Sequence, residues 1–326
     1  MQGSNVRKMF HASLLVSFFT LIPLRAGASQ DDFGKAIAAL QAGEADAALG
    51  LLQLASPSAE AHNLRCRVYF SLEQWEAAET ECQEAVNLEG QNSDYHMWLG
   101  RALGEKADQA SFMSAFSLAK RTRMEFEEAV RLNPQNAPAM ADLGEFYYEA
   151  PAVVGGGAAK ADAVAIQLDP VDQPRAHELR GRTAESRKDF VTAERELKEA
   201  IAASKHPAFQ WMTLASFYRR HERWSEMNAA LHTGIRAAQS DHQATAALFN
   251  GASMLAKSKM DLDLAAQMFR EYLASPVKNE DAPAFVARVR LARLDAATGD
   301  LEGARRERAA ALELAHSYRP ALELKF

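Results

Sequence analysis

The sequence predicts an all-α protein in which about eight helix–turn–helix units stack into an α-solenoid. A small residue recurs every 34 to 44 positions after Leu or a substitute for it. Apolar residues keep helical spacing throughout, and no segment alternates with the period of two that is typical of strands. One unit cannot bury its own apolar stripe, whereas a stack buries a continuous core. The recurring small residues are Cys66, Gly100, Gly144, Gly181, Ala215, Gly251 and Ala292.

The first 28 residues have the pattern of a cleaved secretory signal peptide. Arg7 and Lys8 precede an apolar run at 12–24, and the small residues at 26–28 form a cleavage site. An uncleaved anchor is the alternative, but the run has 13 residues and a span needs about 20. We therefore expect cleavage after Ala28, a periplasmic or secreted protein, and no membrane span in the mature chain.

The rest of the chain, 29–326, is predicted to form one repeat array. The units are expected near 29–57, 58–90, 93–134, 136–170, 174–206, 208–240, 244–275 and 284–318. The third unit carries about ten additional residues within 106–123, whose amphipathic pattern predicts longer helices. Gly155–Gly157 in the fourth unit could cradle a phosphate, but no Gly-Lys-Ser/Thr follows it and no strand precedes it. A widened turn is the preferred interpretation.

Composition limits the classes of partner and chemistry. Removal of the signal peptide takes away three basic residues and no acid, so the net charge changes from −6 to −9 at pH 7. Such a charge argues against nucleic acid held by bulk electrostatics. The motifs His-Glu-x-x-His and Gly-x-Ser-x-Gly are absent. We therefore expect no catalytic residues, no metal site and no cofactor.

The chain has two cysteines, which both fall in the second unit. Cys66 belongs to its first predicted helix and Cys82 to its second. An oxidising compartment makes a disulfide possible, provided that the two positions face each other at the same level of the helix pair. The preferred interpretation is that each cysteine is a small buried residue.

Several segments fall in register with a known repeat. Trp98-Leu99-Gly100, the Ala-Val-Arg-Leu-Asn-Pro segment 129–134 and the Ile-Gln-Leu-Asp-Pro segment 166–170 resemble the tetratricopeptide repeat (TPR) family, and the resemblance covers nearly all of 29–326. The stretch 95–160 resembles exported bacterial TPR proteins of unassigned role. The resemblance implies a right-handed superhelix whose concave groove, lined by the first helix of each unit, binds a protein or peptide segment.

The resemblance also implies which side chains face that groove, since the residue after each recurring small residue does so. Four of the seven residues at this position are Arg, although the chain is acidic overall. Arginine gives paired donors to carboxylates, so an acidic partner is one option. The alternative is that these arginines pair with groove acids such as Glu178 and Glu185 and only solvate the surface. The candidates at this position are Arg67, Arg101, Glu145, Arg182 and Arg293, and neighbouring groove positions add Arg219 and Arg220.

The expected function is that of a non-catalytic, exported adaptor that binds a partner segment in the groove. A second hypothesis is a structural component of an envelope assembly that docks through its terminal repeats. An enzyme with an unrecognised site is the weakest alternative.

Overall fold

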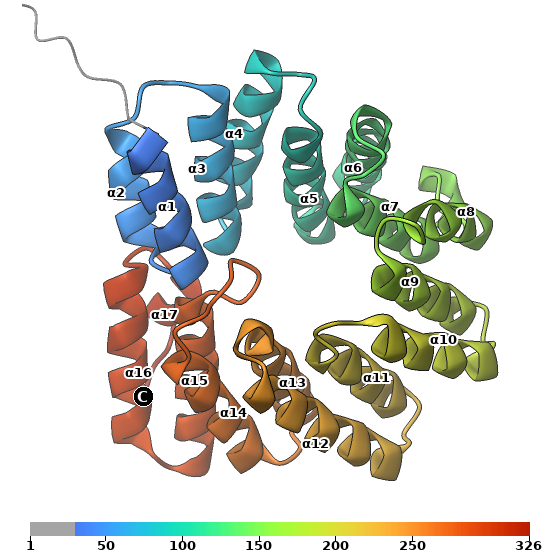
Figure 1. Ribbon diagram of the computed structural model, residues 1–326. Helices are drawn as coiled ribbons and strands as arrows, with labels where there is room; N and C mark the ends of the chain where they lie inside the picture. Colours follow the sequence, from blue (N-terminus) through green and yellow to red (C-terminus); the bar gives the residue numbers. More distant parts are fainter. Residues whose placement is uncertain (1–29) are drawn as a thin grey trace, which may run out of the picture.

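The computed structural model describes residues 30–326, and the predicted signal peptide 1–28 lies outside this range. The described part is an all-α solenoid of consecutive helix pairs without strands (Figure 1). The first half contains α1 Gln30–Ala42, α2 Ala45–Gln53, α3 Ala59–Ser71, α4 Trp75–Leu88, α5 Ser93–Gln109, α6 Phe112–Leu132, α7 Ala137–Glu149, η1 Ala152–Val154 and α8 Ala158–Leu168. The second half contains α9 Gln173–Ser186, α10 Phe190–Ala203, α11 Ala208–Arg220, α12 Trp224–Ser240, η2 His242–Ala244, α13 Ala246–Ser258, α14 Leu262–Ala274, α15 Ala284–Thr298, α16 Leu301–Leu314 and α17 Arg319–Leu322.

Local signals in the sequence explain where many of these helices begin. The Ser58 hydroxyl accepts a hydrogen bond from the Ala61 amide at 3.2 Å and so caps α3. Asn136 caps α7 in the same way, and Pro138 occupies the first turn, where its missing N–H costs nothing. Asp189 and Asp300 cap the second helices α10 and α16. Each cap satisfies a backbone donor that would otherwise lack a partner.

The recurring small residues lie where neighbouring helices approach closely. A Cβ added at Gly181 would lie 3.0 Å from the Leu197 side chain on the paired helix α10. A Cβ at Gly144 would lie 2.3 Å from Leu179, on the first helix of the next unit. The sequence pattern therefore marks contacts within units and between them.

The predicted insertion lengthens the third helix pair. α5 has 17 residues and α6 has 21, whereas α3 and α4 have 13 and 14. Exposed Phe112 and Met113 lie at the start of α6. In the fourth unit Gly155 adopts a φ of 101°, and the segment forms a widened turn, as expected.

The array curves until its two ends meet (Figure 1). α2 packs on α16, and one hydrophobic core joins residues of α1–α3 to residues of α15–α17. His316 contacts Asp46 through its backbone amide and through Nδ1, both at 2.8 Å. The buried Tyr318 hydroxyl donates to Glu73 at 2.7 Å. The second hypothesis from the sequence is docking of other proteins on the terminal repeats. In this structure the terminal repeats pack against each other, so they would have to separate first.

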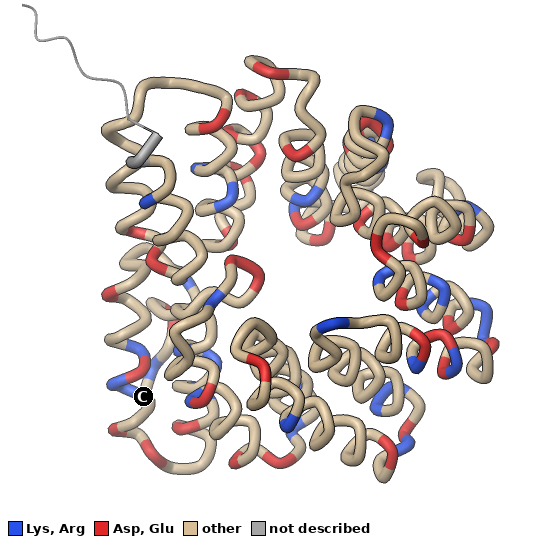
Figure 2. The backbone as a smooth tube through the Cα atoms, in the orientation of Figure 1, with Lys and Arg blue, Asp and Glu red and all other residues tan. Residues whose placement is uncertain are grey.

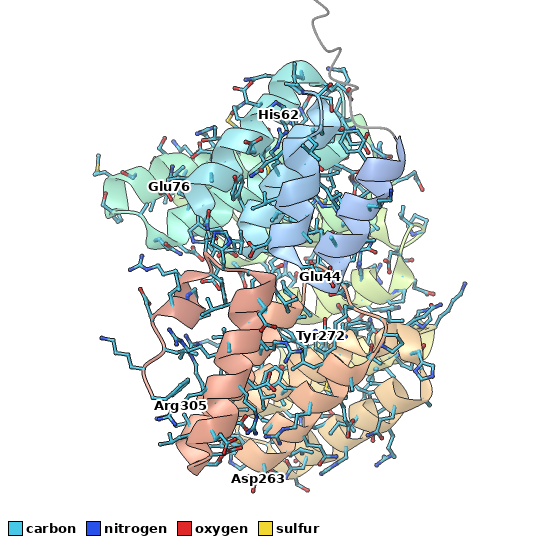
Figure 3. All side chains as sticks on the ribbon, turned by 90° about the vertical axis from the view of Figure 1, so that its left-hand side faces the viewer. Glu44, His62, Glu76, Asp263, Tyr272 and Arg305 are labelled. Atoms are coloured by element: carbon cyan, nitrogen blue, oxygen red, sulfur yellow. A yellow bond between two sulfur atoms is a disulfide. The ribbon has the colours of Figure 1, made fainter. Side chains whose placement is uncertain are left out.

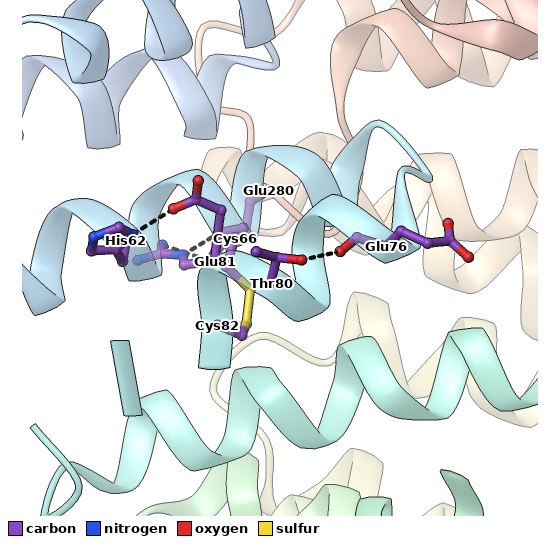
Figure 4. The surroundings of a disulfide bond; sticks show 8 residues. His62, Cys66, Glu76, Thr80, Glu81, Cys82 and Glu280 are labelled. Atoms are coloured by element: carbon purple, nitrogen blue, oxygen red, sulfur yellow. Dashed lines mark hydrogen bonds and ion pairs between the residues drawn. A yellow bond between two sulfur atoms is a disulfide. The ribbon is translucent and has the colours of Figure 1, made fainter. Parts of the chain in front are cut away.

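The two cysteines form a disulfide, so the preferred interpretation of two separate buried residues is wrong. Cys66 on α3 and Cys82 on α4 are fully buried, and their Cα atoms are 5.2 Å apart (Figure 4). The antiparallel helices place the two residues opposite each other at the same height. The sequence spacing alone did not decide whether this condition for a disulfide is met. His62 and Glu81 bridge the same two helices at 2.6 Å.

Candidate functional site

The inner face of the closed array is lined by the first helix of each pair (Figure 1). Three hollows of the array have volumes of about 600 Å³ each. One is bounded by side chains from α1, α3, α5, α7 and α9 together with the loop before α15. Four of the candidate residues line these hollows, namely Arg67, Arg101, Glu145 and Arg293.

Arg67 and Arg101 both lie close to one aromatic ring. The Arg67 guanidinium lies 5.5 Å from the centre of the Trp98 ring, and that of Arg101 lies 4.6 Å from it. Trp98 itself is buried. Stacking on an aromatic face restricts where each guanidinium can point and is favourable in itself. The groove residues of α3 and α5 thus form one fixed cationic cluster, the Arg67–Trp98–Arg101 cluster.

Both arginines of this cluster have carboxylate partners. Arg67 Nε and Nη2 donate to Glu280 at 2.9 and 2.8 Å. Arg101 donates to Asp142 of α7 at 2.6 and 3.3 Å. Burial opposes the charge of Arg101, but Asp142 dominates and raises the pKa of Arg101, with smaller contributions in the same direction from Asp281 and Glu280. The sequence did not reveal Asp142 or Glu280 as groove residues.

The middle of the groove is acidic. Burial, together with Glu149 and Asp142, raises the pKa of Glu145 on α7. Burial likewise raises the pKa of Glu178 on α9. The charge of Arg182 partly opposes this rise in the pKa of Glu145 and of Glu178. Arg182 itself makes no hydrogen bond or ion pair within residues 30–326. The arginines are therefore interleaved with acids that are costly to ionise.

Arg219 and Arg220 at the end of α11 differ in their environments. Arg220 makes a two-bond fork with Glu185 at 2.8 Å, and His221 adds a contact to the same carboxylate at 2.9 Å. Although burial opposes the charge of Glu185, these bonds hold its pKa below the ordinary value. The Arg219 Nε is buried, and none of the described side chains or carbonyls accepts from it. The alternative that the arginines pair with groove acids thus holds for Arg220 and Glu185.

Arg293 belongs to a basic hollow between α13 and α15. This hollow, of about 600 Å³, is lined by Lys257, Lys259, Arg290 and Arg293 and by no acidic residue. Arg290 donates to the Ser253 hydroxyl and lies 4.5 Å from the centre of the Phe249 ring, so its position is fixed. No carboxylate of the described chain lies within ion-pair distance of any of the four cations.

The charges of the basic hollow act on one another. Burial, with a further contribution from Arg293, lowers the pKa of Arg290, although Tyr318 and Glu73 oppose this. Ala256, Leu262 and Leu294 supply an apolar wall. An anion with an apolar neighbour would match both features of the hollow.

Over the described part of the chain, no group of three or more His, Cys, Asp or Glu side chains is arranged to hold a metal ion. Among α1–α17, no helix combines the length and the apolar character needed to cross a membrane.

Comparison with solved structures identifies the fold. A thermophilic TPR protein of Thermus thermophilus matches with a TM-score of 0.50 and 20% identity, over 58% of this chain and 97% of that one. The resemblance to Pseudomonas aeruginosa PilF has a TM-score of 0.39 at 13% identity, over 80% of this chain and 95% of that one. The C-terminal part of a Cytophaga hutchinsonii TPR repeat-containing protein gives 0.41 at 15% identity, over 77% and 97%. No family model and no curated protein matches the sequence. The chain has the TPR fold.

Proposed function

We propose that this protein is an exported, non-catalytic adaptor that binds a segment of a partner protein in its concave groove. The TPR fold is the scaffold of many protein-interaction modules, and its groove accommodates extended or helical segments. The observation that carries the proposal is the basic hollow between α13 and α15. Its four cations lack ion pairs within the described chain, while most other groove arginines have one.

Export is supported by two features of the chain. Arg7, Lys8 and the apolar run at 12–24 have the order of a signal peptide. The Cys66–Cys82 disulfide fits an oxidising compartment such as the periplasm or the extracellular medium.

The chemistry of the hollow favours an acidic partner segment. Lys257, Lys259 and Arg293 are exposed at its rim, and Arg290 is half-buried behind them. A carboxylate that enters the hollow would receive charge-assisted hydrogen bonds, each worth about 1.5–3 kcal/mol. The apolar wall would contact the rest of the same segment. Nucleic acid is disfavoured by the net charge of −9 that the mature chain would carry.

The proposal is tested by charge reversal at the rim. A partner is first captured by crosslinking in the native cells, and its affinity for purified variants is then measured. Lys257→Glu/Arg293→Glu should weaken binding by about a hundredfold or more, because two contacts of this size are lost and replaced by repulsion. The effect should shrink as salt is raised.

The matched control is Arg305→Glu/Arg306→Glu, which changes the net charge equally on the outer helix α16. Both arginines are exposed, and Figure 3 shows Arg305 pointing away from the array. Equal affinities of the two double variants for the partner would contradict groove binding at this hollow.

A further inference from the structure

The loop before α15 brings two acidic residues into the groove. Residues 275–283 link α14 to α15 without regular structure, and their tip is a turn in which the Ala282 amide donates to Asn279. Figure 1 shows the loop reaching across to α3, and Figure 2 shows acidic residues at its tip. These residues are Glu280 and Asp281. The turn Asn279–Ala282, here named the tip turn, thus presents an acidic pair to the inner face.

The two acidic residues of the tip turn are held differently from the rest of the loop. At the base, Thr245 donates to the Val277 carbonyl at 3.2 Å. The buried Tyr272 hydroxyl donates to the carbonyl of Ala282, the last residue of the tip turn. At the tip, the hydrogen bonds that reach α3 come from one side chain, Arg67, which grips Glu280 from 213 positions away in the sequence. Asp281 is exposed and makes no ion pair within 30–326. The base and the Ala282 end of the tip turn are therefore anchored, whereas Glu280 is held to α3 by a single guanidinium–carboxylate fork.

The tip turn lies where the hollows of the groove meet. Asp281 borders three of them, with volumes of about 610, 600 and 450 Å³, and Glu280 borders two. The first of these hollows also contains Asn63, which is 5% exposed and whose Nδ2 finds no acceptor in the described structure. A buried donor without a partner is costly, and the carbonyl of a bound segment would satisfy it. The tip turn thus separates hollows of the groove that could hold a bound peptide segment.

We propose that the Arg67–Trp98–Arg101 cluster is a second docking position for an extended acidic segment of the partner, and that Glu280–Asp281 occupies it in cis until the partner displaces it. This inference rests on the proposed function. The cis contact shows the geometry of recognition: a carboxylate on an irregular segment, gripped by Arg67 beside the Trp98 ring. The same fork is available to any glutamate of an incoming chain.

The loop 275–283 competes with the partner segment for the same arginines, and the strength of this competition follows from the covalent attachment of the loop to the chain. A short linker holds its ligand at an effective concentration of about 1 mM, so for an intrinsic Kd of about 0.1 mM the loop weakens binding of a second acidic segment about tenfold. Removing the charges of Glu280 and Asp281 should therefore raise the affinity for the second acidic segment about tenfold.

The experiment uses the loop itself as the probe. A fluorescent peptide with the sequence of residues 275–283, blocked at both ends, is titrated by anisotropy into the full mature chain. Glu280→Gln/Asp281→Asn keeps the shape of the tip and should bind the peptide about tenfold more tightly than the wild type. A control peptide with Gln and Asn at the two acidic positions should show no such gain. Adding Arg67→Ala to the double variant should abolish the gain.

Equal peptide affinities for the wild type and the double variant, or a gain that survives Arg67→Ala, would overturn the proposal and leave the fork as a contact that only helps to close the array. Hydrogen exchange on the wild type is a measurement that requires no variant to fold. Excess acidic peptide should speed exchange within 275–283, and unchanged exchange at saturating peptide would also overturn it. Neither assay involves Lys257, Arg293 or the captured partner, so this inference and the proposed function can fail separately.

Discussion

The Cys66–Cys82 disulfide should contribute a measurable share of the stability of the second repeat. The two residues are 16 positions apart and join the helices α3 and α4. Closing a loop of this length in the unfolded chain removes conformational entropy worth about 3 kcal/mol at 25 °C. Both side chains are fully buried, so reduction leaves two thiols in the core without adding solvent-exposed polar groups.

The assay is urea unfolding followed by circular dichroism, with and without a thiol reductant. The wild type should lose about 3 kcal/mol of unfolding free energy on reduction. Cys66→Ala/Cys82→Ala is the control for effects of the reductant, and its midpoint should be the same in both buffers. The prediction is contradicted if the wild-type midpoint is the same with and without the reductant, under conditions in which mass analysis shows both thiols free.

Three further predictions follow from the packing, the charges and the N-terminal pattern. Gly144→Leu and Gly181→Leu should each lower the unfolding free energy by about 1–3 kcal/mol through overpacking. Gly50→Leu is the control and should not show this loss, because a Cβ at Gly50 would meet nothing within 4 Å. Calorimetry of the three variants measures the difference. Glu178 has a folded-state pKa above the unfolded value of 4.5, so its contribution to stability is fully present below pH 4.5 and is lost as the pH rises through the folded-state pKa. Glu178→Gln should therefore raise the melting temperature at pH 7 and leave it nearly unchanged at pH 4, and a variant that melts lower than the wild type at pH 7 would contradict this sign. Mass analysis of the exported protein should give Ser29 as its first residue, and peptides from 1–28 on the exported form would show that the segment is retained.

The helices could be predicted from the sequence because their signals are local. Caps such as Ser58 and Asp189 precede apolar stripes at helical spacing, and the small residues at Gly144 and Gly181 mark close approaches. Each of these patterns reflects contacts within one unit or between adjacent units. The resemblance to the TPR family follows from the same local patterns, and the solved TPR structure supports it at the level of the fold.

Features that depend on the curvature of the whole array could not be predicted in this way. The apolar residues of the first unit do not reveal that they belong to the same core as Phe285 and Tyr318 of the last one. Arg67 was placed in the groove, but its partner Glu280 comes from a loop between the seventh and eighth units, and only closure of the array brings them together. For Cys66 and Cys82, the spacing fixes neither the rotation nor the level of the two helices. These features are set by summed small rotations between repeats.

The candidate groove residues lie in different environments that a sequence pattern does not separate. Arg67, Arg101 and Arg220 have carboxylate partners in forks, and two of these partners, Glu280 and Asp142, lie outside the predicted set. Arg293 lies in a hollow whose other charged residues are all basic. Whether an arginine has an ion-pair partner depends on side chains from other repeats. The sequence therefore identified a set of groove positions without showing which arginines are unpaired.

Site-specific photocrosslinking tests the central claim, that the concave groove binds a partner, most directly. A photoreactive residue placed at Arg293, inside the groove, and another at Arg305, on the outer face of α16, are compared in the native cells, and adducts are identified by mass spectrometry. Binding in the groove predicts a defined adduct from position 293 that position 305 does not give, and the loss of this adduct when Lys257→Glu is added. The same adducts from both positions, or adducts from position 305 alone, would contradict it.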